Sequence, residues 1–154
     1  PEQEQEIWEQ FLELVFLDPN APIFHYSKYE AETIRRLAQL YQASKTQEQL
    51  LQKRLVDLHD RVTRYLILPT ENYSLKTIAQ WLGFQWREAG VSGEQCVCWY
   101  DQWLKTGDRA LLNAIIRYNE DDCRATYHLK TWLVQFLSST EESTDFNLPQ
   151  ALSM

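Results

Sequence analysis

A helical pattern ends at residue 17, and the segment DPNAPIFHY, residues 18–26, follows it. Proline lacks a backbone donor and disfavours helix in the residue before it, so Pro19 and Pro22 mark a break in the chain. The run from Ile23 to Tyr26 is short, apolar and aromatic between turn signals, which is typical of a β-strand. The segment therefore predicts one strand in a chain whose other patterns are helical.

Apolar residues recur at helical spacing along most of the remaining sequence. This periodicity predicts helices over residues 5–17, 29–41, 46–66, 75–82, 96–104, 111–117 and 120–137. Gly107 is a suitable helix stop, and Asp108 is a suitable cap for the helix after it. Within the third helix, Val56-Asp57-Leu58 could instead form a short strand, and the pattern does not decide.

The predicted strand needs a partner. A single strand cannot satisfy its own backbone groups, so we expect it to pair with another chain or with a segment upstream of this sequence. The chain starts at Pro1 and its only methionine is Met154, so we also expect it to be a piece of a longer protein. An exposed strand edge favours pairing with a second copy, which predicts a possible homodimer.

Composition restricts the possible partners. The 154 residues carry 15 basic and 22 acidic side chains, a net charge of −7, and a uniformly acidic surface repels phosphate. Contact with nucleic acid would therefore require a locally basic face. The three cysteines are an odd number in helical patterns, which favours a reducing compartment. Because no apolar run approaches the ~20 residues that span a bilayer, we expect a cytoplasmic protein with no membrane partner.

The acidic run Tyr118-Asn119-Glu120-Asp121-Asp122 is a candidate chemical centre. Four residues apart on a helix, Tyr118 and Asp122 share one face, so a phenol and a carboxylate can converge. A carboxylate is a hard oxygen ligand suited to Mg²⁺ or Mn²⁺. The run could instead be a plain helix start, with Asn119 as the N-cap and three acids favoured by the helix dipole. Taken alone, the run fits both interpretations.

A second candidate, His25-Tyr26-Ser27-Lys28-Tyr29-Glu30, follows the predicted strand directly. Sites of α/β proteins usually lie at such a strand-to-helix turn. Here too a plainer interpretation stays open. Glu30 could be a surface acid near a helix start, and His25 could be a structural histidine.

Together the two segments resemble a known family. The first resembles the second motif, usually His-Asn-x-x-Phe-Asp, of RNase H-like 3′–5′ exonucleases of the DEDD or DnaQ-like superfamily. The second matches the Tyr-x-x-x-Asp motif of the same enzymes. The intervening phrases are similar to the predicted exonuclease domain associated with RecB-family nucleases: Leu55-Val56-Asp57-Leu58, Leu68-Pro69, Tyr73-Ser74-Leu75-Lys76 and Trp81-Leu82-Gly83-Phe84. The resemblance covers roughly residues 5–137, in the family's order.

This resemblance implies an incomplete α/β fold of RNase H-like type, dominated by helices, with one or two short strands. Residues 1–137 would be the C-terminal portion of the exonuclease domain, and residues 138–154 would be a polar, flexible tail. The implied activity is metal-dependent 3′–5′ exonuclease-type hydrolysis at DNA or RNA ends, with two Mg²⁺ or Mn²⁺ ions in the full domain.

The resemblance also implies roles for particular residues. Glu30 and Asp122 would be metal ligands. Together with Tyr118, which would position the attacking water, they would form the catalytic set. Asp57 is a lesser candidate that would help to arrange the site.

Two departures from the family pattern limit the expected activity. Glu30 stands where most relatives have aspartate, and its extra methylene moves the carboxylate outward. The family's first motif, Asp-x-Glu on the first strand, is absent from the sequence. A two-metal site without those carboxylates loses about half of its ligands, so we expect little or no nuclease activity from this chain alone.

Two alternatives remain open at this point. Basic residues gather in the first half of the chain and could line a strand-binding groove or simply form solvated helix faces: Lys28, Arg35, Arg36, Lys53, Arg54, Arg61 and Arg64. The other function to weigh is a helical interaction or nucleic-acid-binding module without catalysis, in which the acidic run is a plain helix start.

Overall fold

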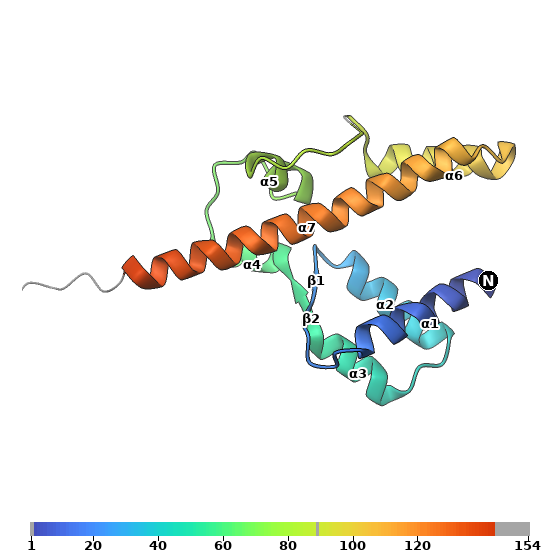
Figure 1. Ribbon diagram of the computed structural model, residues 1–154, viewed down its shortest axis with the longest axis horizontal. Coiled ribbons are helices and arrows are strands. Elements are labelled where there is room, and N and C mark those ends of the chain that lie inside the picture. Colours follow the sequence, from blue (N-terminus) through green and yellow to red (C-terminus); the bar gives the residue numbers. More distant parts are fainter. Residues whose placement is uncertain (1, 89, 144–154) are drawn as a thin grey trace, which may run out of the picture.

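The computed structural model describes residues 2–88 and 90–143, in which helices dominate and a small parallel sheet lies among them (Figure 1). In chain order the elements are α1 (Glu2–Phe16), β1 (Ile23–His25), α2 (Tyr29–Leu40), α3 (Lys45–Arg54), β2 (Leu55–Asp57), α4 (Leu58–Tyr65), α5 (Leu75–Trp81), α6 (Gly93–Thr106) and α7 (Arg109–Ser143). This arrangement is consistent with the predicted helix-dominated, incomplete α/β fold. Within the described ranges, no helix is both long enough and apolar enough to cross a bilayer.

Strand β1 has its partner within the chain. It pairs in parallel with β2, with Ile23 opposite Leu55 and His25 opposite Asp57. The expectation that β1 must pair with another chain or an upstream segment is wrong, because residues 55–57 pair with it directly. Since the strands are parallel and joined through α2 and α3, their carboxyl ends lie at the same edge of the sheet. A homodimer through a remaining strand edge stays a prediction.

Strand β2 divides the helix predicted over residues 46–66 into α3 and α4. Asp57 explains the second boundary, because its Oδ1 accepts hydrogen bonds from the backbone N–H groups of His59 at 2.9 Å and Asp60 at 3.4 Å. An N-cap residue has an extended backbone, so Asp57 can end a strand and start a helix at once. The choice that the sequence left open between helix and strand is therefore settled as a strand, Leu55–Asp57.

Helix α7 is continuous over 35 residues, where the sequence predicts two helices. Gly107, with a φ of 70°, ends α6 as predicted, and Oδ1 of Asp108 accepts a hydrogen bond of 2.9 Å from the N–H of Ala110. Asn119 lies inside α7 and is not its N-cap, so the interpretation of residues 118–122 as a plain helix start is wrong. The helix also includes residues 138–143 of the predicted tail, and residues 144–154 lie outside the described part of the chain.

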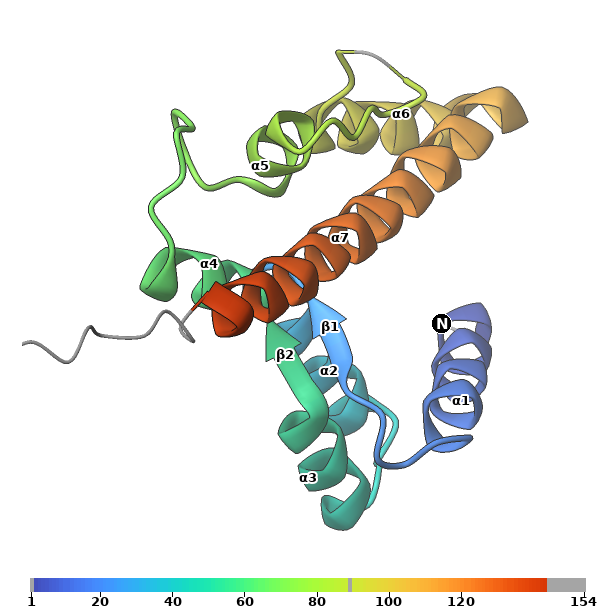
Figure 2. The same cartoon turned by 60° about the vertical axis from the view of Figure 1, so that its left-hand side comes forward.

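Three groups of buried side chains hold these elements together. The first joins α1, α2 and α3 (Trp8, Ile34, Ala38 and Leu51). The second joins α4, α5 and α7 (Leu58, Val62, Ile78 and Leu129). The third joins α5, α7 and the segment after α5 (Ala79, Trp86 and Ala125). Figure 2 shows both strands pointing toward α7, which crosses near their carboxyl ends. The packing thus brings the middle of α7 to the edge of the sheet.

Candidate active site

One pocket contains both of the predicted metal-binding carboxylates. Glu30 and Asp122 line a cavity of about 330 Å³, together with residues that include Tyr26, Leu75 and Thr126. Glu30 lies in the first turn of α2, just after β1, and Asp122 lies in the middle of α7. The pocket is therefore at the carboxyl ends of the parallel strands, where α/β proteins usually place their sites.

The side chain of Asp122 is held by a tryptophan that is distant in sequence. The indole Nε1 of Trp86 donates a hydrogen bond of 2.9 Å to Oδ1 of Asp122. Trp86 is only 8% exposed and packs with Ala79 and Ala125, so the core fixes its position. Among the described residues, Oδ2 of Asp122 has no hydrogen-bond partner. One oxygen of Asp122 is thus fixed, and the other can bind a ligand.

The two acids before Asp122 bind a neighbouring loop. Asp121, only 3% exposed, accepts hydrogen bonds of 2.9 Å from the backbone N–H and from Nε of Arg87. Glu120 accepts from Nη2 of Arg87 at 2.7 Å and from Nη2 of Arg124 at 2.6 Å. Burial alone would raise the pKa of Asp121, but the hydrogen bonds from Arg87 outweigh it and lower that pKa. Of the three acids, only Asp122 lines the pocket.

Both pocket carboxylates have pKa values above the ordinary range. Burial is the main cause of the raised pKa of Glu30, and the negative charge of Asp122 adds to it. Burial is also the main cause for Asp122, and it outweighs the hydrogen bond from Trp86, which lowers the pKa. Keeping both groups ionised in this pocket therefore costs free energy. A bound cation would offset that cost, because it favours the charged form of each carboxylate.

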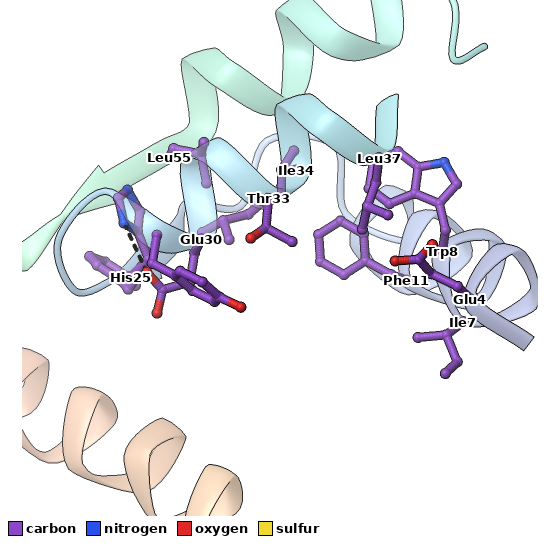
Figure 3. Close-up of a pocket in the computed structure, with 13 residues that line it drawn as sticks. Glu4, Ile7, Trp8, Phe11, His25, Glu30, Thr33, Ile34, Leu37 and Leu55 are labelled. Atoms are coloured by element: carbon purple, nitrogen blue, oxygen red, sulfur yellow. Dashed lines mark ion pairs between the residues drawn. The ribbon is translucent and has the colours of Figure 1, made fainter. Parts of the chain in front are cut away.

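The turn between β1 and α2 sets the direction of Glu30. Ser27 in this turn has a φ of 69°, which is uncommon for a residue with a side chain. Its N–H donates to Oδ1 of Asp57 at 2.8 Å, and its carbonyl accepts from Nδ1 of His25 at 2.6 Å. The same Nδ1 lies 3.9 Å from Oε2 of Glu30, the pair joined by the dashed line in Figure 3. Asp57 does not line the pocket, but it holds the turn that carries Glu30.

A second, apolar pocket of about 340 Å³ shares His25 and Glu30 with the first one. Figure 3 shows these two residues at one end of the apolar pocket, with Trp8 and Phe11 at the other. The side chain of Glu30 is 48% exposed, yet apolar surface borders it. This partial loss of water explains why burial raises its pKa.

Tyr118 lies one turn before Asp122 on α7, but it does not line the pocket that contains Glu30 and Asp122. Its half-buried ring packs against the group formed by Ala79, Trp86 and Ala125. Burial, followed by the charge of Asp122, raises the pKa of its hydroxyl, which therefore stays protonated at neutral pH. The structure thus brings Glu30 and Asp122 together and places Tyr118 beside Asp122, outside the pocket.

Sequence reasoning missed Trp86 and Arg87, the two residues that position the acidic run. They follow the helix predicted over residues 75–82, in a segment with no periodicity of its own. Their partners lie 36 and 34 residues further along the chain. An indole beside a guanidinium in a loop is a weak local signal, and only the packing of that loop on α7 shows what they bind.

Some of the basic residues that were predicted to line a groove make other contacts within the fold. Arg36 pairs with Glu4 at 2.9 Å, Arg64 pairs with Asp60 at 2.6 Å, and Arg54 donates to a backbone carbonyl at 2.7 Å. None of the seven basic residues named for the groove lines the carboxylate pocket. For these three arginines, the contacts within the fold favour a structural role over a role in binding a nucleic-acid strand.

The donor set of the pocket suits a hard divalent cation. Mg²⁺ is commonly held by one or two carboxylates, with water and substrate phosphates completing its coordination. Glu30 and Asp122 supply two carboxylates to one pocket, which matches this number of ligands. They do not form a closed site, because in the part of the chain that the structure describes no group of three or more His, Cys, Asp or Glu residues is placed to hold a metal ion.

The fold and the pocket together define a class of protein. It is an α/β protein with an acidic site at the carboxyl ends of its parallel strands. A family model, RNase_H_2, described as RNase_H superfamily, matches residues 1–134. The chain therefore belongs to the RNase H superfamily. Comparisons with curated proteins and with solved structures gave no match. The RNase H-like part of the resemblance is confirmed, and the finer assignment to DEDD-type, RecB-associated exonucleases stays a prediction.

Proposed function

We propose that this protein hydrolyses phosphodiester bonds of nucleic acid in a metal-dependent reaction of the 3′–5′ exonuclease type, acting at DNA or RNA ends. Membership of the RNase H superfamily suggests nuclease-type hydrolysis of nucleic acid. The observation that supports the metal-dependent form is the shared pocket. Glu30 and Asp122, from two helices far apart in sequence, line a single cavity at the strand ends.

In this proposal Glu30 and Asp122 hold Mg²⁺ or Mn²⁺. Such an ion, when bound, lowers the pKa of water and neutralises developing charge on the phosphate. Trp86 holds one oxygen of Asp122, and the turn at Ser27 holds Glu30, so the pair is oriented before a ligand arrives. We assign to Tyr118 the positioning of the attacking water, because its protonated hydroxyl lies beside Asp122.

A site for two ions needs more carboxylates than this pair. Among the described residues, no further acidic, histidine or cysteine side chain joins Glu30 and Asp122 in a metal-binding group. We therefore expect the 154-residue chain to cleave nucleic acid slowly or not at all on its own. Full activity would need further carboxylates beside this pair.

The test is cleavage of end-labelled DNA and RNA strands in single-turnover reactions with Mn²⁺, in which protein is in excess. Asp122→Asn keeps an acceptor for the Trp86 indole but removes the charge, and should lower the rate at least about 100-fold. The matched control is Asp101→Asn on α6, an exposed residue that pairs with Lys105 and should not change the rate. Where the unaltered chain cleaves at a measurable rate, an equal rate for Asp122→Asn would show that Asp122 is not a metal ligand in catalysis. Where it does not, calorimetric Mn²⁺ titration of the same proteins makes the comparison, and equal affinities for Asp122→Asn and the unaltered protein would show the same.

A second candidate function, a helical interaction module without catalysis, has one observation in its favour. Helix α6 has no buried residue, and it exposes an apolar stripe at helical spacing, formed by Val97, Tyr100 and Leu104. Such a stripe is typical of a surface that packs against another protein. This function predicts that Asp122→Asn changes neither metal affinity nor cleavage.

A further inference from the structure

Helix α6 packs on the rest of the chain along one side. It lies beside the first turns of α7, and none of its residues, all of which the structure describes, is buried (Figure 1). Trp99 and Trp103 are only partly exposed, as expected for the side that packs on α7. Val97, Tyr100 and Leu104 share another face, where they are 70%, 49% and 61% exposed. This face therefore keeps an apolar stripe in water that a partner could cover.

The stripe has a defined shape before any partner arrives. The ring of Tyr100 packs on the ring of Trp103, with their centroids 5.4 Å apart. The helix is also capped at both ends. Oγ of Ser92 accepts a hydrogen bond of 3.3 Å from the N–H of Gln95, and Gly107 ends the helix with a φ of 70°. Binding to the stripe would therefore not have to order the helix first, which favours association.

Charged side chains lie along one flank of the stripe. At about 100° per residue, Glu94, Asp101 and Lys105 fall on the same side of Val97 and Leu104. Glu94 is in the first turn of α6 and Lys105 is in the last turn, so the flank is acidic at one end and basic at the other. Lys105 is 71% exposed and pairs with Asp101 at 2.5 Å, whereas Glu94 has no ion-pair partner in residues 2–88 and 90–143.

This order of charges is complementary to itself when the helix is reversed. Two α6 helices that run antiparallel about a two-fold axis level with Tyr100 bring Val97 of each copy to Leu104 of the other. The same axis brings the two copies of one flank together, so Glu94 of each lies near Lys105 of the other. A parallel pair would instead place Glu94 against Glu94. The charges therefore match a second copy of this chain in one orientation.

We propose that α6 is the interface of a homodimer in which the two copies of this helix pack antiparallel through Val97, Tyr100 and Leu104. The inference does not rest on the proposed nuclease function, and it places the dimer at α6 instead of at a strand edge. Helix α6 has 14 residues, a length of about 21 Å. An interface of this length is at the small end of specific interfaces, so the dissociation constant should be roughly 1–100 µM.

The test is sedimentation equilibrium of the protein from about 1 to about 300 µM. Leu104→Lys should weaken the dimer at least about 30-fold, because each substitution occurs twice and places a charge against apolar side chains. The matched control is Leu14→Lys on α1, where the leucine is 68% exposed and outside the stripe, and it should leave the dissociation constant unchanged.

Charge reversal tests the antiparallel orientation. Glu94→Lys and Lys105→Glu should each weaken the dimer about three- to tenfold, since exposed ion pairs are weak and each change occurs twice. The double variant restores opposite charges across the two-fold axis and should recover most of the affinity.

Three results would overturn the proposal. The first is a chain that stays monomeric up to the highest concentration, which would leave a different protein as the occupant of the stripe. The second is a dimer that Leu104→Lys does not weaken, which would place the interface elsewhere. The third is a double charge variant that dimerises no better than either single variant, which would exclude the antiparallel pairing of Glu94 with Lys105.

Discussion

The carboxylates of Asp121 and Asp122 are neighbours in sequence but have different environments. Both oxygens of Asp121 are bound by Arg87, so its charge is satisfied within the fold. Asp122 has one oxygen bound by Trp86, and its pKa is raised. Proteins tolerate a carboxylate with a raised pKa most often where its charge is used, although structural networks also perturb pKa values. At the scale of single residues, Asp122 is therefore the member of the run that we propose as a metal ligand.

The raised pKa values predict how stability depends on pH without metal. Glu30 and Asp122 bind protons more tightly in the folded chain than in the unfolded chain, where the ordinary values are 4.5 and 3.8. Their contribution to the free energy of unfolding is therefore complete below those values and is lost as pH rises through the folded pKa values. Asp122→Asn should remove part of this loss, so the variant should gain stability relative to the unaltered protein as pH rises.

This prediction is measured by urea unfolding of the metal-free protein between pH 4 and pH 7. Groups with lowered pKa values, such as Asp121 and Glu120, lose their contribution as pH falls, which is the opposite sign. Those groups contribute equally to both proteins, so they cancel when the free energy of unfolding of the unaltered protein is subtracted from that of Asp122→Asn. The raised pKa of Asp122 would be contradicted if the difference in free energy of unfolding did not change with pH. It would also be contradicted if that difference shifted in favour of the unaltered protein as pH rises.

At the scale of elements, the position at which α7 begins shows whether the acidic run is a helix cap or lies inside a helix. Its start at Arg109 places Asn119 well inside the helix. Local sequence could not show this, because Asn119 followed by three acids is a good helix start by any local rule. What keeps the helix continuous through that run is long-range, and includes the hydrogen bonds from Arg87 to Asp121 and Glu120.

The sheet shows the same division between local and distant signals. The strand Ile23–His25 could be predicted from its apolar residues and flanking breaks, and the structure confirms it. The strand Leu55–Asp57 stayed undecided in the sequence, because three residues cannot show a strand period. Its identity depends on pairing with β1 across the fold, which no local pattern contains.

Asp57 connects these elements, and its removal should affect both stability and metal binding. Asp57→Ala removes the cap of α4 and the acceptor for the Ser27 N–H, so it should lower the free energy of unfolding by roughly 1–2 kcal/mol. Because the Ser27 turn carries Glu30, Mn²⁺ affinity should also fall several-fold. Urea unfolding and calorimetric Mn²⁺ titration measure the two effects.

The control for Asp57→Ala is Asp108→Ala, which removes the acceptor for the Ala110 N–H near the start of α7. It should lower stability but leave Mn²⁺ affinity unchanged. If Asp57→Ala also left the affinity unchanged, the turn would not position Glu30.

For the whole molecule, the order of motifs along the chain carried more information than any motif alone. The segment ending at Glu30 and the segment ending at Asp122 each had a plain structural interpretation, and their order indicated the RNase H-like family that the comparison confirms. The rest of the pocket wall could not be predicted. Leu75 and Thr126 come from separate helices, and only packing in three dimensions brings them to the strand ends.

The central claim is that Glu30 and Asp122 bind the same divalent ion. The most direct measurement is calorimetric titration of Mn²⁺ into four proteins: unaltered, Glu30→Gln, Asp122→Asn and the double variant. If both carboxylates hold one ion, each single substitution should weaken binding about tenfold or more, and the double variant should lose less than the product of the two. Losses that multiply independently, or single variants that bind Mn²⁺ as tightly as the unaltered protein, would contradict a shared site.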